Sequence, residues 1–324
     1  MKGYKRPILY AFLFACLSFL VAIAFFDLFL RYYNFEKKIK EFPLNISKTE
    51  YPVFKTPIAP NITAKAVVIM DDESKTILFS KNPNLLFSMA STTKIMTALV
   101  ALDYYKLNDI LTVKSEKVEG VNVGFKIGEK LKFEDILYAM LLPSGNDAAL
   151  ALAQNYLPAR SAESRRAGKA GPGGEKEFVK KMNEKARSLN LINTNFADPI
   201  GLEDSQDYTT PLDLIRLTSA ALENKIFADV VKTKTLQISD VTGENEYLLK
   251  NLNKLLGVSG VNGVKTGTTT EAGQVLVTSK QDLDSSNNKH TFIIVVMNSE
   301  DRFSDTRQLL DLISGNINYL SIHP

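Results

Sequence analysis

Three short strings of polar residues in this chain could together carry out nucleophilic chemistry. They are Ser91 with Lys94, Ser144 with Asn146, and a Lys-Thr-Gly string that begins at Lys265. A serine hydroxyl is a poor nucleophile until a base removes its proton. Residues three apart on a helix share one face, so a helix here would place the Lys94 amine beside the Ser91 hydroxyl.

Lys94 can serve as a base only if its pKa falls, because a free lysine stays protonated near neutral pH. Burial would lower that pKa, and so would the positive charge of Lys265 if the third string lies alongside. Each string also has an ordinary explanation, as a helix cap, a turn or the end of a strand. Their occurrence together, in this order, is what favours a catalytic site.

Composition narrows the class of protein. The chain has 324 residues, of which 45% are hydrophobic, enough for one large domain with appendages. Basic residues number 39 against 36 acidic ones, so no nucleic-acid partner is expected. The single cysteine, Cys16, permits neither an internal disulfide nor a Cys/His metal cluster, and we expect no cofactor. A Ser-His-Asp triad would depend on His290, because His323 lies beside the C-terminus.

The N-terminal segment has the composition of a membrane helix. An uncharged run from Ile8 to Phe26 follows three basic residues, and its length is sufficient to cross a bilayer. The run is longer than the core of a typical signal peptide, so residues 1–30 are expected to be an uncleaved membrane anchor, with a cleaved signal segment as the alternative. Residues 31–62 contain several prolines and are expected to form a linker or stalk.

Residues 63–318 are expected to form one domain that contains both strands and helices. Strands are predicted at residues 64–70, 76–79, 274–279 and 291–297. Helices are predicted at residues 91–105, 133–140, 148–156, 175–189, 211–223 and 305–313. Because the strands lie near both ends, we expect one sheet built from the two ends of the domain. Residues 157–174, rich in glycine, are expected to be a mobile insertion.

The three strings also resemble a known family when their neighbours are included. The resemblance is to the D-alanyl-D-alanine carboxypeptidases, the low-molecular-weight penicillin-binding proteins of the serine type. The extended strings are Ser-Met-Ala-Ser-Thr-Thr-Lys, Leu-Leu-Pro-Ser-Gly-Asn-Asp and Gly-Val-Lys-Thr-Gly-Thr-Thr. The resemblance runs from about residue 64 to residue 313, and residues 193–202 also match, although Asp198 stands where Asn is more usual.

The resemblance implies an α/β (α+β) fold of the β-lactamase/transpeptidase-like type. It would have an antiparallel β-sheet flanked by helices and a mostly helical subdomain, here preceded by an N-terminal transmembrane helix. It also implies that Ser91 attacks the carbonyl between the last two D-alanines of a peptidoglycan stem peptide. Lys94 would be the base, Ser144 would relay a proton to the leaving amine, Lys265 would help to set the pKa of Ser144, and water would release the acyl group.

Five further residues are implied as substrate-binding. Asn146 would bind the peptide backbone and hold Lys94, Thr266 would bind the terminal carboxylate, and Gly267 would leave room for the substrate as an added strand. The backbone N–H groups of Ser91 and Thr268 would form the oxyanion hole. Arg302 would assist carboxylate binding, with an ordinary surface arginine as the alternative.

The resemblance implies peptidoglycan peptides and β-lactam antibiotics as partners, with penicillin as a covalent inhibitor. A class A β-lactamase would need a Glu-x-x-Leu-Asn string to release penicillin, and the nearest string, Glu184 to Asn190, has a different spacing. The sequence also leaves open a transpeptidase and a non-catalytic module that binds β-lactams or peptidoglycan. The expected location is the cell membrane, single-pass, with the catalytic domain on the extracytoplasmic side, or outside the cell if the N-terminal segment is cleaved.

Overall fold

The computed structural model describes residues 14, 17–30, 49–57, 59–115, 118–157, 174–202, 205–283 and 288–322. The chain divides into two compact units. One comprises Met1–Thr49 with Ile322–Pro324, and the other comprises Glu50–Ser321. The second unit therefore begins within the predicted linker.

In the first unit, residues 17–30 are helical and their side chains are exposed. The predicted membrane-spanning run Ile8–Phe26 lies partly outside the described residues. Among the described residues, no helix combines the length and the apolar character needed to cross a membrane.

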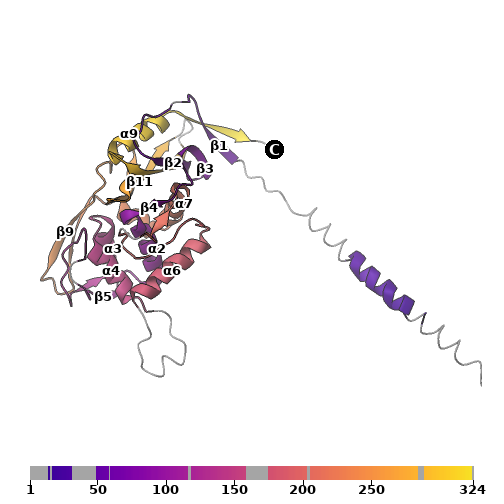
Figure 1. Ribbon diagram of the computed structural model, residues 1–324, viewed down its shortest axis with the longest axis horizontal. Coiled ribbons are helices and arrows are strands. Elements are labelled where there is room, and N and C mark those ends of the chain that lie inside the picture. Colours follow the sequence, from indigo (N-terminus) through magenta and orange to yellow (C-terminus); the bar gives the residue numbers. More distant parts are fainter. Residues whose placement is uncertain are drawn as a thin grey trace, which may run out of the picture. The chain divides into compact units, whose positions relative to one another are not determined.

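The second unit is built on a five-stranded antiparallel sheet with strand order β10-β11-β12-β2-β3 (Figure 1). The strands are β2 (Ala66–Asp71), β3 (Thr76–Lys81), β10 (Val261–Thr269), β11 (Gly273–Leu283) and β12 (Lys289–Ser299). The sheet thus combines the first and last strands of the domain, which confirms the prediction of one sheet made from both ends. The two predicted N-terminal strands form the expected hairpin.

Both faces of this sheet are buried, because alternate residues of each strand point to opposite faces. Val68 of β2 and Val295 of β12 belong to one apolar core, which also contains the buried residues of most of the helices. Val67 and Val296 belong to a second core that includes Leu309 of α9 (Arg302–Ile313). The central strands are therefore almost wholly apolar rather than alternating between apolar and polar residues.

The helices lie between the two groups of strands in the sequence. They are α2 (Lys94–Tyr104), α3 (Phe133–Leu141), α4 (Asn146–Asn155), α6 (Glu175–Ser188), α7 (Pro211–Leu222) and α8 (Lys225–Val231), with α9 following β12. All except the short α8 were predicted. The start of α7 shows a local cause, because Pro211 occupies its first turn and Thr210 accepts a hydrogen bond from the Asp213 N–H. The predicted insertion lies almost entirely outside the described residues.

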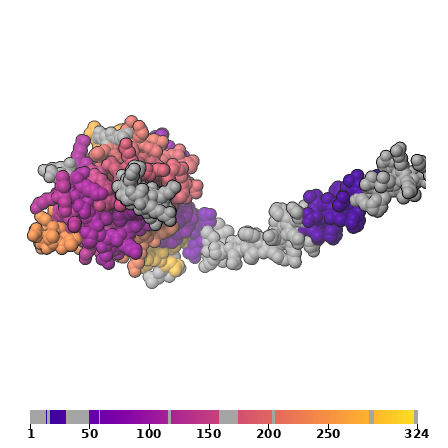
Figure 2. Space-filling view, turned by 90° about the horizontal axis from the view of Figure 1, so that it is seen from below, coloured from indigo at the N-terminus to yellow at the C-terminus, as the bar shows by residue number. Residues whose placement is uncertain are grey.

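Four two-stranded sheets were not predicted. They pair β1 (Thr49–Phe54) with β13 (Ile317–Ile322), β4 (Phe87–Ser88) with β7 (Tyr208–Thr209), β5 (Ile110–Thr112) with β6 (Lys130–Lys132), and β8 (Thr235–Ser239) with β9 (Glu246–Lys250). The β8–β9 hairpin, orange in Figure 2, lies at one end of the domain beside the β5–β6 segment, where the Val241 N–H donates to the Lys130 carbonyl. These strands are short or exposed, so they lack a long apolar pattern.

A buried carboxylate joins the first and last parts of the domain. Asp305 of α9 accepts hydrogen bonds from the Thr63 N–H at 2.9 Å, the Ala64 N–H at 2.8 Å and the Ser299 hydroxyl at 2.6 Å. Burial alone would raise the pKa of Asp305, but the hydrogen bonds from Ser299, Thr63 and Ala64 together outweigh it and lower that pKa. The ionised carboxylate therefore stabilises the junction.

We predict that Asp305→Asn lowers the free energy of unfolding by about 2–4 kcal/mol, because it weakens several charge-assisted hydrogen bonds in a buried site. The folded pKa lies below the unfolded one, so this contribution is complete above the unfolded pKa of ~3.9 and is lost as the pH falls through the folded pKa. Denaturant unfolding at several pH values measures both effects. Asp311→Asn, an exposed change on the same helix, is the control, and equal losses in the two variants would contradict the prediction.

Candidate active site

The predicted nucleophile and base lie at the start of α2, in contact with each other. Ser91 belongs to η1 (Ala90–Thr93), a single 3-10 turn that leads into α2, and Lys94 is the first residue of α2. Residues three apart eclipse each other in a 3-10 turn, which aligns the two side chains. The Lys94 Nζ lies 3.0 Å from the Ser91 Oγ.

Lys94 is completely buried, and its amine contacts two further oxygen acceptors. The Nζ donates to the Asn146 Oδ1 at 2.8 Å and to the Ile200 carbonyl at 2.8 Å, and both of these oxygens can only accept. Together with the Ser91 Oγ, these acceptors match the three N–H donors of the protonated amine. After the loss of one proton, the amine would keep two of these bonds and could present its lone pair to the Ser91 hydroxyl.

Burial lowers the pKa of Lys94 from its ordinary value of 10.5 to about 7. The desolvation of a charged amine is the dominant cause, and the negative charges of Asp198, Asp207 and Asp147 partly oppose it. The base is therefore substantially neutral near physiological pH.

The second motif lies in the tight turn between α3 and α4. Ser144 has a positive φ of 68°, which is uncommon for a residue with a side chain and marks a constrained turn near a site. Its Oγ accepts a hydrogen bond of 2.8 Å from the Nζ of Lys265. Asn146 begins α4 and reaches Lys94, so this turn connects with both lysines.

Lys265 is the second buried lysine. Its Nζ donates to the Ser144 Oγ and, at 2.9 Å, to the Thr266 carbonyl. Its pKa lies well below the ordinary value, first because of burial and then because of the positive charges of Lys94 and Arg302. The charge of Lys94 thus contributes to the low pKa of Lys265, whereas the pKa of Lys94 itself is lowered by burial. The expected effect of the Lys265 charge on Lys94 stays a prediction.

The third motif lies on β10, an edge of the sheet that pairs only with β11 among the described strands. Lys265 and Gly267 pair with Val277 and Val275, whose side chains lie in the core that includes α2. Thr266 pairs with Leu276, whose side chain lies in the core beneath α9. Thr266 and Thr268 therefore face the side of β10 opposite to that of Lys265.

Gly267 lies close to η1. A Cβ at this position would lie 3.0 Å from the Ala90 Cβ and 3.2 Å from the Ser91 backbone nitrogen. The absent side chain therefore lets β10 approach η1 closely, and the room it would leave for the substrate stays a prediction. This approach brings the backbone of the third motif to the nucleophile.

Arg302 contacts β10 from the first turn of α9. Its Nη1 donates to the Gly267 carbonyl at 2.7 Å and to the Thr268 hydroxyl. Burial is the main cause that lowers its pKa from the ordinary value of an arginine, and Asp301 opposes that shift. Arg302 is therefore held against β10, and its part in carboxylate binding stays a prediction.

A cleft of about 760 Å³ joins the motifs. Its lining includes Ser91, Asn146 and Thr268, whereas Thr266 is almost completely buried and does not line it. The nine predicted residues form three groups of contacts, which are Ser91–Lys94–Asn146, Ser144–Lys265–Thr266 and Gly267–Thr268–Arg302.

Sequence reasoning missed the contribution of the loop that precedes β7. The carboxylate of Asp198 accepts hydrogen bonds from the Ile200 and Gly201 N–H groups at 2.6 Å each, which fixes the Ile200 carbonyl on Lys94. Gly201 has a φ of +83°, and a Cβ there would lie only 1.9 Å from the Ala90 carbonyl oxygen. The match of residues 193–202 to the family was the signal that could have located this loop.

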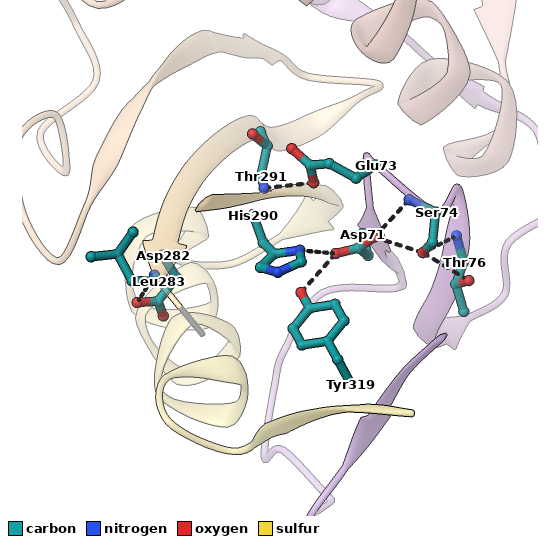
Figure 3. Close-up of polar contacts among 9 residues, drawn as sticks. All are labelled: Asp71, Glu73, Ser74, Thr76, Asp282, Leu283, His290, Thr291 and Tyr319. Atoms are coloured by element: carbon teal, nitrogen blue, oxygen red, sulfur yellow. Dashed lines mark hydrogen bonds and ion pairs between the residues drawn. The ribbon is translucent and has the colours of Figure 1, made fainter. Parts of the chain in front are cut away.

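Two competing assignments are not supported by the geometry. His290 stacks on Tyr319 and lies 3.7 Å from Asp71, which Ser74 and Tyr319 also contact (Figure 3), so it is not the base beside Ser91. Glu184, the nearest equivalent of a β-lactamase glutamate, forms an ion pair of 2.5 Å with Lys181 and lines a different hollow.

Comparison with known proteins agrees with this geometry. The sequence profile described as Peptidase_S11, D-alanyl-D-alanine carboxypeptidase, matches residues 54–301. A D-alanyl-D-alanine carboxypeptidase of Streptomyces sp. (strain K15) is 36% identical over 67% of this chain and 76% of its own. A D-alanyl-D-alanine endopeptidase of Pseudomonas aeruginosa is 30% identical over 72% of each chain. The crystal structure of the Streptomyces K15 DD-transpeptidase covers 79% of this chain and 98% of its own, with a TM-score of 0.68 and 32% identity.

The fold and the site define a serine peptidase of the penicillin-binding type. The chain belongs to the D-alanyl-D-alanine carboxypeptidase family Peptidase_S11.

The pKa of Lys94 generates a prediction about pH. Acylation needs the neutral amine, so its rate should fall as the pH drops through about 7. Asp198→Asn removes the negative charge that most favours protonated Lys94, so the inflection should move to lower pH, while the Asn oxygen can still accept the backbone hydrogen bonds. Stopped-flow acylation by a chromogenic β-lactam gives the profile. Asp229→Asn, a change at a half-exposed position on α8 that is paired with Lys232, should leave it unchanged. A shift of the Asp198→Asn inflection to higher pH would refute this assignment.

Proposed function

We propose that this protein is a serine-type D-alanyl-D-alanine carboxypeptidase that removes the terminal D-alanine from peptidoglycan stem pentapeptides. The observation that carries the proposal is the buried Lys94 amine, whose Nζ lies 3.0 Å from the Ser91 Oγ and whose pKa is lowered by burial to about 7. That contact places a base beside a serine hydroxyl, which is a poor nucleophile until its proton is removed.

In the proposed acylation step, the Ser91 Oγ attacks the carbonyl carbon between the two D-alanines and Lys94 takes the hydroxyl proton. The negative charge that develops on the carbonyl oxygen is stabilised by the backbone N–H groups of Ser91 and Thr268. The close approach of Gly267 to η1 supports this pairing, because it brings the two backbone segments together.

The leaving amine must gain a proton when the C–N bond breaks. We assign this transfer to Ser144, whose hydroxyl is held by Lys265 at 2.8 Å. Asn146 holds Lys94 and binds the peptide backbone. We place the terminal carboxylate beside Thr268 and Arg302, because Thr266 does not line the cleft, and water then hydrolyses the ester on Ser91.

A β-lactam would follow the same first step, since its strained amide places a carbonyl and a carboxylate in a similar relation. Release should be slow, because Glu184 lies outside the cleft and the Asp198 carboxylate is occupied by backbone N–H groups. The expected product is therefore a stable penicilloyl-enzyme.

Mass spectrometry of the full-length, detergent-solubilised protein with penicillin tests the nucleophile. We expect one adduct on Ser91, its absence from Ser91→Ala, and a fall in D-alanine release of at least about 10³-fold in that variant. Ser80→Ala, an exposed change on β3, is the control and should retain both properties. An adduct on another residue, or rapid turnover of penicillin, would contradict the proposal.

We also propose that the protein is anchored in the cell membrane with its catalytic domain on the extracytoplasmic side. The exposed apolar side chains of the N-terminal helix, among them Phe19, Leu20, Phe25 and Phe26, support this location. Peptidoglycan substrates also lie outside the cytoplasm.

Protease added to intact spheroplasts tests this location. We expect digestion of the catalytic domain outside the cell and retention of a short N-terminal fragment in the membrane pellet. A variant that lacks residues 1–30 and carries a cleavable signal instead should be recovered in the soluble fraction. Protection of the catalytic domain until the cells are lysed would refute the proposed orientation.

A further inference from the structure

Three side chains of the kinds that bind metal ions gather at the end of the sheet away from the catalytic cleft. Asp71 is the last residue of β2, Glu73 lies in the turn that follows, and His290 lies near the start of β12 (Figure 3). The residues that line the cleft include none of them. Val295 of β12 is level with Lys265 across β11 and lies five residues from His290, which is about 16 Å along the strand.

The pairing of β2 with β12 brings these side chains together. The Asp72 N–H donates to the Thr291 carbonyl at 2.8 Å, and the Glu73 Oε2 accepts a hydrogen bond of 2.8 Å from the Thr291 N–H. The turn after β2 is therefore fixed against the start of β12, with Glu73 beside His290.

The ligand atoms are close enough for one ion to reach all of them. The Asp71 Oδ2 lies 3.7 Å from the His290 Nδ1, and one ligand atom from each of the three residues lies within 4.8 Å of the other two. Tetrahedral zinc, with bonds of about 2.0–2.2 Å, holds its ligands about 3.4 Å apart. Asp71 and His290 are buried near that spacing already, and the exposed Glu73 side chain can move to complete it.

Other side chains hold Asp71 and His290 in place. The Asp71 Oδ1 accepts hydrogen bonds from the Ser74 N–H at 2.8 Å and the Ser74 hydroxyl at 2.6 Å, and its Oδ2 accepts one from the Tyr319 hydroxyl at 2.9 Å. His290 stacks on the Tyr319 ring, with 3.7 Å between the ring centres. A carboxylate oxygen has two lone pairs, so the Oδ2 can bind Tyr319 and a metal ion together. Contacts of this kind orient the ligands of metal sites.

The charges and the atom types favour Zn²⁺. Two carboxylates and a neutral imidazole carry two negative charges, which match a divalent cation. Lysines nearby have acidic partners of their own, since Lys75 pairs with Asp72 at 2.8 Å. Lys280 likewise pairs with Asp282 at 2.5 Å. An imidazole nitrogen disfavours Ca²⁺ and Mg²⁺, which prefer oxygen ligands, whereas Zn²⁺ accepts nitrogen and oxygen together and needs no thiolate.

We propose that Asp71, Glu73 and His290 bind one Zn²⁺ ion, with water as its fourth ligand. The ion would join the turn after β2 to the start of β12. It would also fix Tyr319 of β13 through Asp71, and with it the β1–β13 pair. The role is structural and independent of the reaction at Ser91. The alternative is an ordinary ion pair between Asp71 and a protonated His290.

Zinc binding by the full-length, detergent-solubilised protein, first freed of metal with a chelator, tests the site. The variants are His290→Gln and Glu73→Gln, and the second alters an exposed side chain that folding does not require. The controls are His323→Gln, which removes the only other histidine of the chain, and Glu244→Gln, an exposed position between β8 and β9. Competition with a chromophoric chelator measures the affinity, and the visible spectrum of Co²⁺ in place of Zn²⁺ reports the coordination geometry.

We expect the wild type and both controls to bind one equivalent of Zn²⁺ with a Kd of about 1 μM or lower. Each variant should bind at least about 10-fold more weakly. Zinc should also raise the midpoint of thermal unfolding of the wild type but not that of His290→Gln, because an ion that binds only the folded state stabilises it. Failure of the wild type to bind zinc would overturn the site and leave the ion pair. Undiminished affinity in either variant would overturn it as well.

Discussion

The site depends above all on the removal of one lysine amine from water. Lys94 is enclosed by Ser91, Asn146 and the Ile200 carbonyl, and desolvation is what makes it a base near neutral pH. The enclosing groups come from segments far apart in the sequence. Loss of packing in any of these segments would let water reach the amine and raise its pKa. The packing of η1, α4 and the loop before β7 around Lys94 therefore keeps this amine desolvated.

Burial also lowers the pKa of a second lysine of the site, Lys265, which contacts Ser144. Lys265 is buried and lies against Ser144, in a turn whose positive φ requires support from its surroundings. Burial of two amines near one another opposes stability, because neither can be charged at low cost. The extensive apolar cores on both faces of the sheet offset that cost. Strain and unfavourable burial are thus concentrated at the cleft, as is common at sites that carry out chemistry.

Much of this arrangement could be predicted from the sequence. The long apolar strands and the amphipathic helices were predictable because their residues follow one period, and the motifs around Ser91, Ser144 and Lys265 identified the reactive groups. The 3-10 turn at Ser91 was not predictable as distinct from a helix, since the two share the three-residue spacing. The contacts of the Ile200 carbonyl and of Gly267 depend on the tertiary approach of other segments, which no local pattern encodes. The short strand pairs were missed because their alternation extends over too few residues.

The open edge of the sheet has a consequence for how substrates are chosen. Among the described strands, β10 pairs on one side with β11 and has no strand on the other. A peptide bound along β10 would become a temporary sixth strand, held largely through backbone groups that every peptide possesses. Selection must then come from the few side-chain positions at the two ends of that added strand. The enzyme would accordingly recognise where a peptide ends more sharply than which residues precede that end.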